Sequence, residues 1–87
     1  MKVKVKDFNP KYETIELLVY KTATWFIAIG TVELQKLKRI YDEYYVYSYK
    51  YFEDTKSTSV IIGKEPKYDC KEDTTSHWKV ERSSNEL

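Results

Sequence analysis

Apolar and polar residues alternate over two stretches near the start of the chain. Valines alternate with lysines over residues 3–6, and Ile15, Leu17 and Val19 form the apolar side of a longer alternating run. Successive side chains of a strand point to opposite faces, so each stretch predicts a strand with one buried face. The lysines beside the valines also suit an exposed sheet edge, because they discourage pairing with another molecule.

Two later segments are more continuously apolar. Residues 25–29 (WFIAI) contain no polar side chain, which predicts a central strand covered on both faces. Residues 58–63 (TSVIIG) follow a polar turn and predict the returning strand of a hairpin. Trp78 and Val80 alternate with polar residues and predict a short final strand.

The hydrophobic period changes between these strands. Leu34, Leu37 and Tyr41 recur at helical spacing and predict one amphipathic helix over about residues 31–44. Thr31 is the expected N-cap, because its hydroxyl can accept a hydrogen bond from a free N–H of the first turn.

These elements together predict an α+β fold of two layers. A mostly antiparallel sheet of about five strands packs against the single helix. With 87 residues the chain is expected to form one domain over residues 1–82, followed by a disordered tail at residues 83–87.

Four tyrosines at every second position stand out in the segment YYVYSYKYF: Tyr45, Tyr47, Tyr49 and Tyr51. On a regular strand their rings form one column on one face. The column is either a wall of the core, facing the helix, or an exposed contact surface with Lys50 beside it. Tyrosine is enriched at protein interfaces and also stacks on nucleic-acid bases. An exposed column could therefore bind either a protein or a nucleic acid.

Charge limits the classes of partner. The chain has 15 basic and 14 acidic residues, whereas a strong sequence-independent nucleic-acid binder is expected to have a clear basic excess. The N-terminus lacks the apolar segment of a signal peptide, and residues 25–29 are too short to span a membrane. A single cysteine, Cys70, favours a cytoplasmic location, which is the host cytoplasm if the protein is viral.

Motifs that carry chemistry are scarce. Cys70 and His77 are the only cysteine and histidine, and nothing in the sequence supplies a third group that would orient them as a nucleophile and base. Asp69, Cys70, Asp73 and His77 lack the paired spacing of a zinc site. We therefore expect no catalytic residue, no metal and no cofactor, and the chain is not expected to be an enzyme.

The sequence accordingly favours a small binding protein that acts through protein–protein interaction. The abundance of Lys, Tyr and Ile over Ala, Gly, Pro and Arg indicates an A/T-rich coding genome, which favours an inhibitor or accessory protein of a phage or mobile element. A nucleic-acid-binding module that uses the tyrosine strand and nearby lysines is the alternative. Edge strands at residues 3–6 and 58–63 also leave homodimerisation by strand pairing open.

Overall fold

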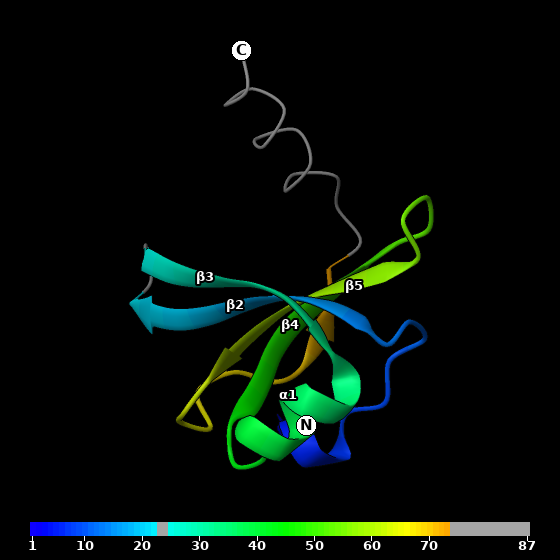
Figure 1. The fold of residues 1–87 in the computed structure, drawn as a ribbon. Helices are drawn as coiled ribbons and strands as arrows, with labels where there is room; N and C mark the ends of the chain where they lie inside the picture. Colours follow the sequence, from blue (N-terminus) through cyan, green and yellow to red (C-terminus); the bar gives the residue numbers. More distant parts are fainter. Residues whose placement is uncertain (23–24, 74–87) are drawn as a thin grey trace.

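The computed structural model describes residues 1–22 and 25–73, and in these ranges it is a two-layer α+β fold (Figure 1). The fold class predicted from the sequence is confirmed: a mixed sheet packs against a single α-helix. The elements in chain order are β1 (Val3–Lys4), a 3₁₀ turn (Val5–Asp7), β2 (Thr14–Thr22), β3 (Trp25–Glu33), α1 (Leu34–Ile40), β4 (Tyr45–Phe52), β5 (Ser57–Gly63) and β6 (Lys71–Glu72).

The strands lie side by side in the order β1-β4-β5-β2-β3, and β6 also pairs with β4. The pairs β1·β4, β4·β5 and β2·β3 are antiparallel, whereas β2·β5 and β4·β6 are parallel. The expectation that residues 58–63 form an exposed edge is therefore wrong, because β5 lies between β4 and β2. Its small and apolar side chains are almost all buried, as suits a strand with neighbours on both sides.

The core lies between the sheet and α1. Ile15 and Leu17 of β2 and Val60 of β5 point to the same face, and Leu34 and Leu37 of α1 pack against them. We call this side of the sheet the helix face and the opposite side the far face. The alternation of β2 predicted from the sequence is confirmed, because Ile15, Leu17 and Val19 are all buried.

The helix is shorter than the predicted range of residues 31–44. Thr31 belongs to β3, where it lies opposite Glu16 and donates a hydrogen bond of 2.9 Å to the Glu16 carboxylate, so it is not the N-cap. Glu33 takes the N-cap position without a side-chain bond. Pairing with β2 keeps the chain extended to Glu33, because each extended residue there gains a ladder partner. At the other end Tyr41 caps the helix, its N–H bonding to the carbonyl of Leu37.

The N-terminal segment is strand only at Val3–Lys4, rather than over residues 3–6. The chain turns at Val5, whose N–H donates to the carbonyl of Tyr44 at 2.8 Å and whose side chain is fully buried in the core. Burial of Val5 and Phe8 draws this segment off the sheet and over the edge of the core. β1 is an outer strand of the sheet, which agrees with the expectation that its lysines lie at a sheet edge.

Three expectations fall on chain that the structure does not describe. The final strand at Trp78 and Val80, the role of His77 and the tail at residues 83–87 lie outside the described residues. The single domain over residues 1–82 stays a prediction.

Candidate interaction surfaces

β3 carries the most exposed apolar side chains of the described sheet. Trp25 is 59% exposed and Ile29 45%, and Phe26 and Ile27 are also exposed. The expectation that residues 25–29 form a central strand covered on both faces is wrong, because β3 is the last strand of the sheet. Among the strands that the structure describes, β3 pairs only with β2, which leaves its outer edge open.

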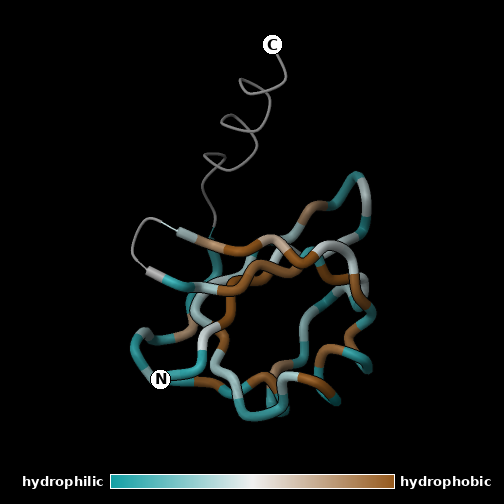
Figure 2. Tube along the Cα trace, turned by 60° about the vertical axis from the view of Figure 1, so that its left-hand side comes forward, coloured by the Kyte–Doolittle hydropathy of each residue, from teal (hydrophilic) through white to brown (hydrophobic). Residues whose placement is uncertain are grey.

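The β2–β3 pair extends from the body as a long hairpin, and its apolar outer strand is brown in Figure 2. The hairpin is irregular, with register shifts between Leu17 and Leu18 and between Tyr20 and Thr22. At the first shift Ile29 is the additional residue, and Gly30 beside it has a φ of 114°, which side-chain-bearing residues rarely adopt. The bulge divides β3 and leaves Trp25–Ala28 as a separate apolar stretch, and the second shift, at Lys21 of β2, lies opposite Trp25 and Phe26.

The four-tyrosine strand does not form one column. Between Val46 and Ser48 the pairing of β4 with β5 shifts by one residue, because Tyr47 is bulged out of the ladder. A one-residue shift exchanges the faces of all later side chains. Tyr49 therefore lies opposite the core residue Val60, whereas Tyr45, before the bulge, lies opposite Gly63.

The four rings consequently have different surroundings. Tyr49 packs on Phe8 with ring centres 5.3 Å apart, and Tyr51 lies beside it on the helix face. Tyr45 lies under the Lys4 ammonium, 5.7 Å from the ring centre. Lys50 is buried, with its ammonium 6.0 Å from the centre of the Phe52 ring. The expected partner-binding role of these residues stays a prediction, but the structure does not bring them together on one surface.

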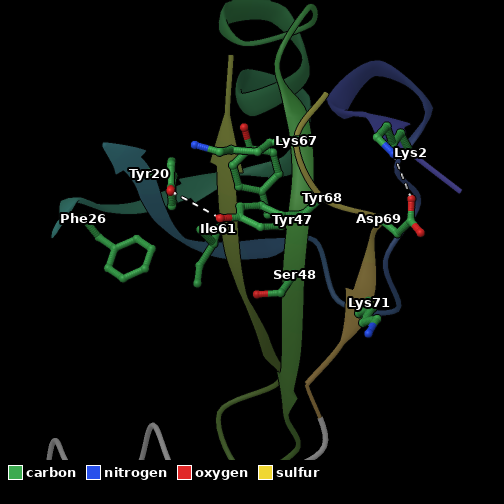
Figure 3. Close-up of a pocket in the computed structure, with 10 residues that line it drawn as sticks. All are labelled: Lys2, Tyr20, Phe26, Tyr47, Ser48, Ile61, Lys67, Tyr68, Asp69 and Lys71. Carbon is green, nitrogen blue, oxygen red and sulfur yellow. Dashed lines mark hydrogen bonds and ion pairs between the residues drawn. The ribbon is translucent and has the colours of Figure 1, made fainter. Parts of the chain in front are cut away.

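Tyr47 instead joins a cluster of rings on the far face (Figure 3). The rings of Tyr20, Tyr47 and Tyr68 contact one another at nearly perpendicular angles, with centres 5.0 to 5.8 Å apart. Phe26 packs edge-on against Tyr20 at 5.9 Å. The Tyr47 hydroxyl donates to the carbonyl of Glu65 at 2.7 Å, which satisfies the polar end of a largely buried side chain. We call Tyr20, Phe26, Tyr47 and Tyr68 the aromatic cluster.

A shallow hollow of about 550 Å³ lies over the aromatic cluster, and lysines stand around it. Lys67 lies over the Tyr20 ring at 5.3 Å, Lys2 is paired with Asp69 at 3.2 Å, and Lys71 stands at the lower end in Figure 3. A second hollow of about 240 Å³ adjoins the first through Tyr20 and adds Lys21 and Lys64. The residues shared by the two hollows are Tyr20, Tyr47 and Lys67.

The hydroxyl groups of the cluster are polarised by their neighbours. A hydrogen bond of 3.3 Å joins the hydroxyls of Tyr20 and Tyr68; it lowers the pKa of Tyr20 and raises that of Tyr68. The Lys67 ammonium also lowers the pKa of Tyr20, since a nearby positive charge favours the phenolate. Burial raises the pKa of Tyr47. The hollow therefore combines an aromatic floor with the ammonium of Lys67 over the Tyr20 ring.

Cys70, the cysteine considered above as a nucleophile, lies within the described part of the chain. Cys70 is half-buried against the core, and burial raises the pKa of its thiol, the opposite of what a nucleophilic cysteine needs. Within residues 1–22 and 25–73, no three His, Cys, Asp or Glu side chains are placed to hold a metal ion. No helix in those ranges has the length and apolar character needed to cross a membrane.

The aromatic cluster was not predicted from the sequence. Tyr20 and Tyr68 are 48 positions apart, and neither belongs to a motif. The signal that could have indicated it is the local pattern Lys67-Tyr68, a cation next to a ring in a segment otherwise poor in apolar residues. Comparison of the chain with protein-family models, with curated proteins and with solved structures finds no match.

Proposed function

We propose that the chain is a non-enzymatic binding protein that adds an extended strand of a partner protein to the open edge of β3. The observation that supports this proposal is that β3 has the apolar composition of a central strand but lies at the edge of the sheet. The segment has the uninterrupted apolar sequence of a strand covered on both faces, yet it is the exposed outer strand of the sheet. A partner strand with apolar side chains would provide the missing cover.

Physical chemistry favours strand addition at this edge. A sheet edge presents unpaired backbone N–H and C=O groups, and natural edges are usually protected by charges or by proline. Residues 25–32 contain neither, and the first charged residue of β3 is Glu33. Main-chain hydrogen bonds would supply affinity, and pockets for alternate side chains would supply specificity. Trp25 is suited to be the anchor, because tryptophan is enriched among residues that dominate binding energy.

The bulge at Ile29 defines the extent of the binding strand. A partner strand would pair with Trp25–Ala28, where β3 itself has no additional residue, and would end at the bulge. In this mode the chain would act by occupying a surface of its partner, as an inhibitor or accessory protein does. Turnover of a substrate by the purified chain would contradict the proposal.

The test compares two exposed isoleucines, Ile27 at 37% and Ile40 at 53%. Ile27→Lys places a charge in the middle of β3, and Ile40→Lys places the same charge on the exposed side of α1. Both variants should keep the far-ultraviolet circular dichroism of the wild type. Partner capture from the source cell should be lost with Ile27→Lys and retained with Ile40→Lys, and hydrogen exchange of the β3 amides should slow in the captured complex. Retention of the same partners by both variants would sink the proposal.

The strand that pairs with β3 could also come from a second copy of this chain, which would make the protein a homodimer. Of the homodimer edges expected at residues 3–6 and 58–63, the second is ruled out because β5 is internal, whereas Val3–Lys4 is an outer strand. The longer open edge of β3 is the one that this proposal uses. Self-pairing of Trp25–Ala28 would place only apolar side chains opposite one another. Light scattering coupled to size-exclusion chromatography decides between the sources: a dimer of the purified wild type that becomes a monomer with Ile27→Lys identifies the second copy.

A further inference from the structure

We propose that the lysine-rimmed hollow over the aromatic cluster binds single-stranded nucleic acid, with bases on the exposed rings and phosphates on the surrounding lysines. This site is on the far face of the sheet and does not depend on strand addition at β3. Only Phe26 belongs to both surfaces, so the two proposals are tested with different variants.

The rings provide surfaces for stacking. Phe26 is 38% exposed and Tyr68 42%, whereas Tyr47 is buried against Tyr20 and Tyr68 and held by its bond to Glu65. Because each ring contacts another edge-on, the cluster is already ordered before a ligand arrives, so little side-chain entropy is lost on binding. Stacking of a base on an aromatic side chain is tolerant of sequence, since every base has a π face.

Basic residues are concentrated around this hollow and the second hollow that adjoins it. Five lysines but only two carboxylates line the two adjoining hollows: Lys2, Lys21, Lys64, Lys67 and Lys71, with Glu65 and Asp69. In the rest of the described chain the sign is reversed, with ten acidic residues against eight basic ones. Asp69 is already paired with Lys2, which reduces its repulsion of an anion. The balanced net charge of the whole chain therefore conceals a local positive surface.

The arrangement of rings and lysines suits a single strand of nucleic acid better than a single nucleotide or an acidic peptide. The lysines are distributed along two hollows that share Tyr20, Tyr47 and Lys67 instead of converging on one point, as a row of phosphates requires. An acidic peptide would neutralise the lysines but would leave the exposed rings of Phe26 and Tyr68 without a stacking partner. The combination of cations and ring faces is what sites for single-stranded nucleic acid share.

Fluorescence anisotropy with a labelled oligothymidine and a labelled oligouridine of about ten nucleotides tests the charged part of the site. If two phosphates meet Lys67 and Lys71, the variant K67Q/K71Q should reduce the slope of log affinity against log salt by about 1.4, at roughly 0.7 per phosphate for a single strand. The matched variant Lys36→Gln removes a cation from α1 and should leave affinity and slope unchanged. Equal effects of these variants, or no binding to either oligonucleotide at low salt, would overturn the proposal.

The aromatic part has its own test. Tyr68→Leu keeps the apolar bulk of residue 68 but removes its aromatic face, so affinity should fall by roughly tenfold with the fold intact. In a nuclear magnetic resonance titration, the amide signals of Tyr20, Tyr47 and Tyr68 should move and those of α1 should not. Polyglutamate serves as the competitor. If it displaces the oligonucleotide at equal charge concentration, the site recognises charge alone and the proposal is wrong.

Discussion

The ring of Tyr47 fills the space into which a side chain at Gly63 would extend. A Cβ atom built on Gly63 overlaps the far end of that ring. The bulge in β4 and the glycine that ends β5 are therefore parts of one arrangement, because only a residue without a side chain lets Tyr47 lie across the sheet toward Tyr20.

Gly63→Ala should destabilise the protein by about 1–3 kcal/mol, the usual cost of overpacking a well-filled site. Urea unfolding measures this loss. In a Tyr47→Leu background the ring is gone, so the same substitution should cost much less, and the two changes should be strongly non-additive. An equal cost of Gly63→Ala in both backgrounds would show that the ring is not the obstacle.

Helix α1 offers a matched pair of substitutions. Leu37 is buried against the sheet and Leu37→Ala should lower the free energy of unfolding by about 2–5 kcal/mol, through lost burial and a cavity. Ile40, on the same helix, is exposed, and Ile40→Ala should change it by less than about 0.5 kcal/mol. Chemical denaturation of both variants measures the difference. Comparable losses would contradict the placement of α1 on the core.

Stability should decrease in acid through Glu53. A hydrogen bond from the Tyr12 hydroxyl, and secondly the Lys11 ammonium, lower the pKa of Glu53 below its usual 4.5. Its contribution is therefore present above pH 4.5 and lost as the pH falls through the lower pKa of the folded state. Urea midpoints between about pH 6 and about pH 3 should fall more steeply for the wild type than for Glu53→Gln. Parallel curves would exclude this contribution.

Cys70 should react slowly. Burial raises the pKa of its thiol, so little thiolate is present at neutral pH, and the side chain is partly covered by the core. Alkylation by iodoacetamide, followed by mass spectrometry, should be much slower in buffer than in denaturing urea. Equal rates in the two solvents would show that the thiol is not protected by the fold.

The sequence was informative wherever burial follows a regular period. The alternation at Ile15, Leu17 and Val19 and the helical spacing of Leu34 and Leu37 both place these residues in the core, as observed. From these periods the two-layer α+β class follows. The regular pattern is a reliable guide here because all of these side chains face the core between the sheet and α1.

The errors occur where tertiary pairing overrides a local pattern. Thr31 has the chemistry of an N-cap, but pairing with Glu16 keeps it in β3. The tyrosine column is interrupted by a bulge at Tyr47 that no residue type announces in the sequence, because the space for the bulged ring is provided by Gly63 of another strand. The apolar run at residues 25–29 does form a strand, but the prediction that it is central and covered is wrong, because the strand order of the sheet is set by pairing between distant segments.

The parallel ladder between β2 and β5 has a consequence for how the chain folds. Ile15 and Thr58 lie opposite one another although they are 43 positions apart. The hairpins β2–β3 and β4–β5 are local, but each contributes only part of the sheet face that α1 covers, so neither forms the core alone. Their docking must close a long loop before any burial rewards it, which costs entropy. We therefore expect folding to be limited by the meeting of two preformed hairpins, and unfolding to separate them in one cooperative step.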